Sequence, residues 1–362
     1  MKRIMLLFFC FAIVACMKET KPSVKQIDID FAQKEKVAFS LSQIFENVSY
    51  IKLDTSCLVG QIDEIRKFGE TLYMCDKNEG TIHQYGMNGK YITSLKKRGR
   101  AKNEYIVLTD FDVSPVNGDI HIYDGGSKRF LVYSKEGIFK RTFHTDEIIR
   151  DFAILSNGDY LMYTPDKNGD AKRGLWQTDS VGKFRKQIVR IHDDFQYGGI
   201  YPQYLTHIDE KYIGLMGGED ADNFYIISED TVGIQLHINY NISIPRELQR
   251  EKNIDFAKHK GNVYTKNNYF ESHRWIWFGT TDFDKMVVCF YDKNTDKCYK
   301  ITGKDNVVED VKLFGIPLSV YDDMMINVIY ASGALSSPTL KEKFPDVTET
   351  SNPILEIVKI TQ

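Results

Sequence analysis

Side chains that could recognise a ligand gather in a few short stretches of the chain. Arginine, carboxylate, imidazole and tyrosine groups occur together there, and aromatic rings beside charged groups are what a carbohydrate or peptide ligand would use. The candidates for ligand binding are Arg100, Glu104, Tyr105, His192, Asp194, Tyr201, Tyr264 and His273. A structural alternative is open for Arg100 and Glu104, which could bond the backbone and each other and so hold their loop rigid.

Local signatures of common catalytic chemistries are missing. The chain has no Gly-x-Ser-x-Gly, no His-Glu-x-x-His and no phosphate-binding loop, so serine hydrolase, zinc protease and nucleotide chemistry lack their motifs. We therefore assign no catalytic residue and expect no cofactor. A metal ion bound by histidines from separate repeats is an alternative, although we expect no metal site. The scattered histidines are His83, His121, His192, His207 and His273.

The elements that must position these groups form a repeat. Two stretches that begin near Asp76 and Asp124 each predict a strand, a turn, a second strand, a glycine turn and a third strand, at an offset of 48 residues. The matched pairs are Asp76 and Asp124, Ile82 and Phe130, Tyr85 and Tyr133, Gly89 and Gly137, and Tyr91 and Phe139. A repeat of this length with four strands per unit is typical of a propeller blade.

The rest of the chain predicts an all-β, six-bladed β-propeller of four-stranded antiparallel blades. Strand groups are expected at about 62–95, 109–143, 150–190, 204–240, 270–302 and 311–330. A short helix over 246–259 and a loop over 332–352 interrupt the pattern. The strands Val48–Asp54 and Pro353–Ile360 have no hairpin partner, so we expect the two chain ends to close the ring in one sheet, which leaves no open edge between blades. Segments that cross from one blade to the next should carry the ligand-binding residues.

The N-terminus predicts the cellular location of the protein. Lys2 and Arg3 precede an apolar run that ends at Ala15 and is too short to span a bilayer as a helix. The run and Cys16 resemble the lipobox of bacterial lipoproteins, which implies cleavage before Cys16 and lipid attachment to its sulfur. The expected domains are a signal peptide at 1–15, a tether and edge segment at 16–47, and the propeller at 48–362.

The net charge restricts the class of binding partner, and the cysteine content bears on disulfide formation. Without the signal peptide, 45 basic residues face 50 acidic ones, a net charge of −5, which argues against nucleic acid as a partner. Four cysteines remain besides Cys16, and an exported protein could pair them. Cys289 and Cys298 could face each other across a hairpin, or Cys289 could oppose Lys300. We favour free, buried thiols.

Several segments resemble one family. The repeat at 76–91 is similar to that of NHL-type propellers, and the wider order resembles the six-bladed β-propeller lipoproteins, NHL-like or TolB-like, of Gram-negative gut anaerobes. The matching segments are Tyr50–Thr55, Ile62–Ile65, Gly99–Tyr105 and Asn352–Lys359. Three positions of Gly99–Tyr105 differ from the glycine-rich turn of that family. The resemblance implies a fold and an address, an outer-membrane lipoprotein on the periplasmic or cell-surface side, but no settled activity.

Two functions are consistent with these observations. The first is a non-enzymatic binding or scaffold protein, held at the membrane through lipidated Cys16, that binds a glycan, a peptide or an envelope protein. The alternative is a lyase or hydrolase that uses histidines and carboxylates on the channel face, with a possible metal ion. The two functions differ in one requirement: the enzyme needs histidines and carboxylates from several repeats to lie close together.

Overall fold

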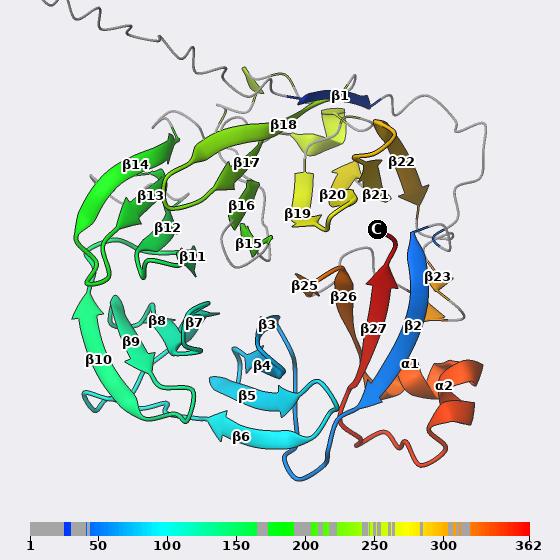
Figure 1. Cartoon of the computed structure of the whole chain (residues 1–362), viewed down its shortest axis with the longest axis horizontal. Coiled ribbons are helices and arrows are strands. Elements are labelled where there is room, and N and C mark those ends of the chain that lie inside the picture. Colours follow the sequence, from blue (N-terminus) through cyan, green and yellow to red (C-terminus); the bar gives the residue numbers. More distant parts are fainter. Residues whose placement is uncertain are drawn as a thin grey trace, which may run out of the picture.

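The chain forms a ring of sheets around a central axis (Figure 1). We use the word channel for the region along this axis, which side chains of the innermost strands occupy. The structure is a computed structural model, and all statements below concern the residues that it describes. These are 25–29, 41, 44–164, 173–191, 204–208, 213–216, 223–240, 245, 247–248, 251, 255–259, 262, 265–282, 285–302, 307–308, 311–312 and 319–362. The predicted all-β, six-bladed propeller is confirmed, since six antiparallel sheets follow one another around the ring.

Each of the first three blades is a four-stranded meander. Blade 1 contains β3 Glu64–Phe68, β4 Thr71–Asp76, β5 Thr81–Gly86 and β6 Tyr91–Leu95. Blade 2 contains β7 Leu108–Val113, β8 Ile120–Asp124, β9 Arg129–Tyr133 and β10 Phe139–His144. Blade 3 contains β11 Asp151–Ile154, β12 Tyr160–Thr164, β13 Gly174–Thr178 and β14 Phe184–Arg190. The first strand of each blade lines the channel and the fourth lies on the rim.

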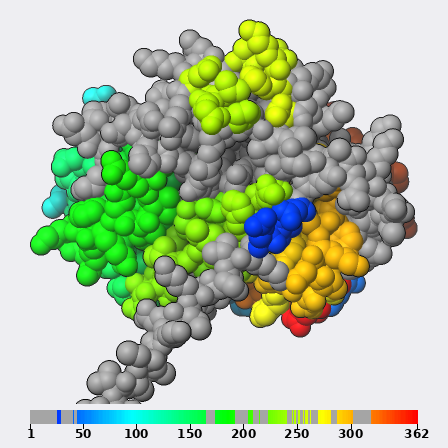
Figure 2. Space-filling model, turned by 90° about the horizontal axis from the view of Figure 1, so that it is seen from above, coloured from blue at the N-terminus to red at the C-terminus, as the bar shows by residue number. Residues whose placement is uncertain are grey.

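Blades 4 and 5 follow the same order, with one addition. Blade 4 contains β15 Leu205–His207, β16 Ile213–Met216, β17 Asn223–Ile227 and β18 Val232–Tyr240. The predicted N-terminal edge strand, β1 Lys25–Ile29, pairs parallel to β18 and extends that sheet (Figure 2). Blade 5 contains β19 Thr265–Glu271, β20 Trp275–Asp282, β21 Lys285–Asp292 and β22 Lys297–Thr302.

The sixth blade closes the ring with both ends of the chain. It contains β25 Ser319–Tyr321, β26 Met324–Ile329, β27 Ile354–Ile360 and, on the outside, β2 Phe45–Lys52. Strands β2 and β27 are antiparallel, with Val48 opposite Val358, so the expected meeting of the two ends in one sheet is confirmed. The prediction of the sixth strand group at 311–330 was wrong in extent, because β24 Val311–Lys312 pairs with β23 Val307–Val308 outside the blade.

Two expectations about the interruptions need adjustment. The segment 332–352 is not a plain loop, because it contains most of α1 Ala331–Ser336 and all of α2 Pro338–Lys343. Leu340 and Ala334 anchor these helices on a small apolar cluster with Ile329 and Ile354. Of the helix expected over 246–259, the described residues show the 3-10 helix η3 Phe256–His259.

The hydrophobic core lies between the blades. One apolar cluster fills each junction around the ring, so every sheet is covered on both faces. Blade 1 packs on blade 2 through Ile82, Phe111 and Ile122, and on blade 6 through Leu72 and Leu355. Burying an apolar side chain stabilises the fold by about 1.5–3 kcal/mol, and here that stabilisation requires a neighbouring blade on each side.

The repeated turn residues act as predicted. Asp76 accepts a hydrogen bond from the Glu79 amide at 2.8 Å, and Asp124 accepts one from the Gly126 amide at 3.1 Å, so both carboxylates begin a chain reversal. Gly89 has φ +79° and a Cβ there would lie 2.5 Å from the Lys52 carbonyl oxygen, so this turn requires glycine.

The alternation of strand direction defines two faces. We call the side that carries the blade-to-blade connections and the turns between second and third strands the crossing face. The other turns lie on the opposite face. The first connection, 96–107, and the turn at 77–80 therefore lie on the same side of the ring, where Lys96 of the connection pairs with Glu79 of the turn.

Candidate functional site

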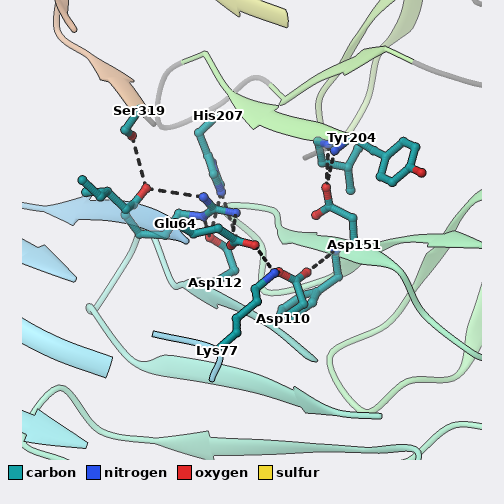
Figure 3. Close-up of polar contacts among 12 residues, drawn as sticks. Glu64, Lys77, Asp110, Asp112, Asp151, Tyr204, His207 and Ser319 are labelled. Carbon is teal, nitrogen blue, oxygen red and sulfur yellow. Dashed lines mark hydrogen bonds and ion pairs between the residues drawn. The ribbon is translucent and has the colours of Figure 1, made fainter. Parts of the chain in front are cut away.

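The innermost strands carry charged side chains into the channel (Figure 3). They come from β3, β7, β11 and β15, and Lys77 joins them from the turn after β4. We call this group the channel cluster, and its members are Glu64, Arg66, Lys77, Asp110, Asp112, Asp151 and His207. Except for Lys77 and His207, these residues are at most 5% exposed. Charged groups are almost never so buried unless they are paired.

Contacts in and beside one half of the cluster join blades 1, 2, 4 and 6. The Arg66 Nε atom donates to Asp112 at 3.2 Å, which links blade 1 to blade 2. The His207 Nε2 atom lies 3.0 Å from both carboxylate oxygens of Asp112, which links blade 4 to blade 2. On blade 6, the Ser319 hydroxyl donates to the Ile65 carbonyl oxygen at 3.2 Å. The carboxylate of Asp112 therefore holds two cationic or donor groups from other blades.

The aspartates also bond the backbone of the next blade. Asp110 accepts from the Phe152 amide at 2.9 Å and Asp112 from the Ile154 amide at 2.8 Å. Asp151 in turn accepts from the amide of Leu205 at 2.9 Å. Such a hydrogen bond stabilises a fold by about 0.5–1.5 kcal/mol, and by about 1.5–3 kcal/mol where the carboxyl group is ionised. These three carboxyl groups therefore clasp blade 2 to blade 3 and blade 3 to blade 4.

Burial changes the protonation of the other half of the cluster. Burial, and then the charges of Glu64 and Asp151, raise the pKa of Asp110 well above its usual range. Burial and Glu64 raise the pKa of Asp151 to about 6. The Oδ1 atom of Asp151 accepts no hydrogen bond, which also favours the neutral form. Burial would lower the pKa of Lys77, but Glu64 and Asp110 raise it above its ordinary value.

Asp112 behaves in the opposite way. Burial would raise its pKa, but His207 and Arg66 together with the Ile154 amide lower the pKa below its ordinary value. The site therefore separates an ionised carboxylate, Asp112, from two carboxyl groups that hold protons more tightly, Asp110 and Asp151. Such separation is found in catalytic sites and also in structural ion-pair networks. Here every one of the three carboxyl groups also bonds the next blade.

The histidines of the described residues do not converge on one point. His121 bonds the Tyr160 hydroxyl at 2.7 Å, and burial lowers the pKa of His121 to about 3. His83 bonds Ser94 at 2.9 Å. Within the described ranges, no three histidine, cysteine or carboxylate groups are placed to hold a metal ion. His192 lies outside these ranges.

The predicted site residues of the first connection divide into two kinds. Tyr105 is fully buried, and its hydroxyl donates to the Gly80 carbonyl oxygen at 2.7 Å. Glu104 accepts from the Ala101 amide at 2.9 Å. Both side chains thus hold the loop, as the structural alternative expects for Glu104, and the Tyr105 ring lies in the core. Arg100 is exposed and does not pair with Glu104 among the described contacts.

His273, a further candidate, does not lie with these residues. His273 lies in the turn between β19 and β20, on the opposite face, where it bonds Asp323 at 2.7 Å. Its expected place on a crossing was therefore wrong, because the turn joins a first strand to a second strand. The other four candidates lie outside the described residues: His192, Asp194, Tyr201 and Tyr264. Cys16 also lies outside them.

Sequence reasoning missed most of the channel cluster. Its signal was a charged residue at every second position of a strand otherwise made of core residues, as in Asp110-Phe-Asp112 and Glu64-Ile-Arg66. Alternate residues of a strand point to the same side, so both charges of each pair lie on the same face of their sheet. The four described cysteines form no disulfide, as favoured. Cys75 and Cys289 are buried as expected, whereas Cys57 and Cys298 are partly exposed. Cys289 is opposite Lys300.

Fold and channel together define a six-bladed β-propeller whose central channel is crossed by buried ion pairs. A family model described as a domain of unknown function, DUF4934, matches residues 24–359. The chain belongs to this DUF4934 family. No curated protein matches the chain.

Two solved structures share the fold. One is a Bacteroides fragilis protein that is described as exported on the basis of inference. It is 18% identical to this chain with a TM-score of 0.79, and the match covers 93% of this chain and 100% of that chain. A member of the DUF4221 family from Bacteroides vulgatus is 11% identical with a TM-score of 0.51, over 88% of this chain and 97% of that chain. At these identities the likeness concerns the fold. None of the described helices is long and apolar enough to cross a membrane.

Proposed function

We propose that the mature protein is a lipid-anchored propeller of the cell envelope that binds a glycan, a peptide or a protein partner and catalyses no reaction. The observation that carries this proposal is the use of the channel carboxyl groups. Each of three carboxyl groups accepts a hydrogen bond from a backbone amide of the next blade: Asp110, Asp112 and Asp151. Groups with this task make the ring rigid, and a rigid ring suits the presentation of binding loops on the crossing face.

The anchor is part of the proposal. The basic residues, apolar run and Cys16 at the N-terminus support export and lipid attachment, and the description of the Bacteroides fragilis protein as exported supports the same address. We propose that the protein lies at the outer membrane. We also propose kinship with NHL-type propellers, which the first two repeats support. Metabolic labelling with a palmitate analogue should mark the full-length protein and not the Cys16→Ser variant. Equal labelling of both would contradict the anchor.

Binding without turnover can be tested directly. The mature protein is incubated with panels of envelope glycans and peptides, and each ligand that binds is recovered and analysed by mass spectrometry. We expect stoichiometric binding and an unchanged ligand mass after prolonged incubation. Recovery of a cleaved or rearranged ligand, lost in an Asp110→Asn variant that still folds, would contradict the proposal and favour an enzyme.

A further inference from the structure

The first connection concentrates positive charge on a protein that is acidic overall. Between β6 and β7, five of the seven residues from 96 to 102 are lysine or arginine, and all five are exposed. They are Lys96, Lys97, Arg98, Arg100 and Lys102. The mature chain has a net charge of −5, so this connection differs in sign from the average surface.

Three of these cations are free to bind an external group. Lys96 pairs with Glu79 at 2.9 Å, and Arg98 donates to the Asn78 carbonyl oxygen. Lys97, Arg100 and Lys102 make no side-chain ion pair or hydrogen bond within the described residues. Like charges held close together repel each other, and an anion that lies between them relieves this repulsion.

The backbone beneath these cations is fixed from the inside. The loop closes on itself, since the Gly99 amide donates to the Tyr105 carbonyl oxygen at 2.9 Å and the Tyr105 amide to the Lys97 carbonyl oxygen at 3.0 Å. A Cβ on Gly99 would lie 1.9 Å from the Glu104 carboxylate, so that carboxylate fills the centre of the loop.

Blade 2 holds the loop from its other side. The Arg129 guanidinium donates to the carbonyl oxygens of Ala101, Lys102 and Glu104. The Tyr133 hydroxyl donates to the Asn103 carbonyl oxygen at 2.9 Å. The loop therefore presents its cations from a backbone that is already ordered, which lowers the entropy cost of binding.

We propose that Lys97, Arg100 and Lys102 form a binding site for an acidic oligosaccharide, one that carries carboxylate or sulfate groups along its chain. This inference rests on the proposed binding function and names its ligand class. Arginine and lysine are the side chains that recognise such anions, arginine through its planar fork of donors. The exposed amide side chain of Asn103 adds a partner for sugar hydroxyl groups.

Other polyanions fit this surface less well. A peptide partner needs buried apolar or aromatic anchors, and no exposed residue from 96 to 104 is a large apolar one. Nucleic acid requires a basic domain and many phosphate contacts. An anionic membrane would have to lie near the tether, but β1 is on blade 4 and β6 is on the far side of the ring (Figure 1).

The test compares two charge-reversal variants of the mature protein. The first is Lys97→Glu, Arg100→Glu and Lys102→Glu. The matched control changes three exposed lysines elsewhere, Lys90→Glu, Lys135→Glu and Lys186→Glu, and so alters the net charge equally. Calorimetry measures the affinity of each protein for a uronate oligosaccharide and for a sulfated one, with a neutral oligosaccharide of equal length as reference, at low and at high salt.

We expect wild type to bind at least one acidic oligosaccharide, more weakly at high salt. The site variant should lose roughly 10-fold or more in affinity, about what two or three surface ion pairs supply, and the control should lose less than half of its affinity. Equal losses in both variants, or no binding by wild type, would overturn the inference. Acidic peptides and phosphatidylglycerol vesicles are titrated in the same way, and binding confined to either of them would also overturn the inference. If both variants still bind a neutral glycan, the result would contradict the proposed site for acidic oligosaccharides but would leave the proposed binding function intact.

Discussion

The imidazole of His207 and the carboxylate of Asp112 meet across the channel at 3.0 Å, although 95 positions separate them in the chain. Blade 4 thereby contacts blade 2 without blade 3 between them. The same carboxylate accepts from Arg66 of blade 1. Asp112 also accepts from the Ile154 amide of blade 3, so four blades are bonded through this one residue at the centre of the ring.

Removal of Asp112 should destabilise the whole propeller. Asp112→Ala leaves the buried Arg66 with Glu64 as its remaining carboxylate partner, and breaking a buried ion pair costs about 3–5 kcal/mol. Glu79→Ala removes an ion pair whose side chains are 59% and 64% exposed, so the free energy of unfolding should fall far less, because water and salt screen an exposed pair. Urea unfolding followed by tryptophan fluorescence measures both. Similar losses in the two variants would show that the channel pairs are no stronger than surface pairs.

The channel carboxyl groups should make stability depend on pH. The pKa of Asp151 is raised from 3.8 to about 6, so the folded state binds this proton more tightly than the unfolded state. Its contribution is fully present below pH 3.8 and is lost as pH rises through about 6. Asp151→Asn keeps an acceptor for the Leu205 amide and should flatten this dependence between pH 4.5 and 7. Unfolding free energies at these two pH values provide the measurement, and an unchanged slope in the variant would rule out the assignment.

Closure of the ring should depend on β2 and not on β1. A chain that starts at residue 53 lacks the outer strand of blade 6 and exposes the edge of β27, so we expect aggregation or a non-cooperative transition. A chain that starts at residue 30 lacks only β1, which is an added fifth strand, and should unfold cooperatively. Gel filtration and thermal unfolding distinguish the two. A monomeric, cooperative protein from the shorter chain would show that the closing strand is dispensable.

The first connection should lose its order when Gly99 is replaced. The added Cβ of Gly99→Ala would meet the Glu104 carboxylate at 1.9 Å. Loss of the hydrogen bond from the Ala101 amide to Glu104 would destabilise the loop by about 0.5–1.5 kcal/mol. We expect limited trypsin digestion within 96–102 to become roughly 10-fold faster, since cleavage follows local opening. Gly233→Ala, where a Cβ meets nothing within 4 Å, is the matched control. Equal protection of Gly99→Ala and wild type would contradict the packed loop.

The sequence by itself determined the ring. Strand alternation, the turn residues Asp76 and Asp124 and the glycine turns recur at one offset, and these are local properties that a repeat displays without knowledge of its neighbours. The unpaired end strands β2 and β27 then predicted closure, because an open edge would be left otherwise.

Only the tertiary structure decided which polar groups meet. Asp110, Asp112, Asp151 and His207 come from three blades, and their contacts depend on how far each blade is rotated around the channel, a quantity that no local pattern contains. The same holds for Tyr105, whose ring could face a ligand or the core according to the position of Gly80 on a separate strand pair. Local sequence sets strands and turns through short-range sterics and hydrogen bonds, whereas the site arises from packing between segments far apart in the chain.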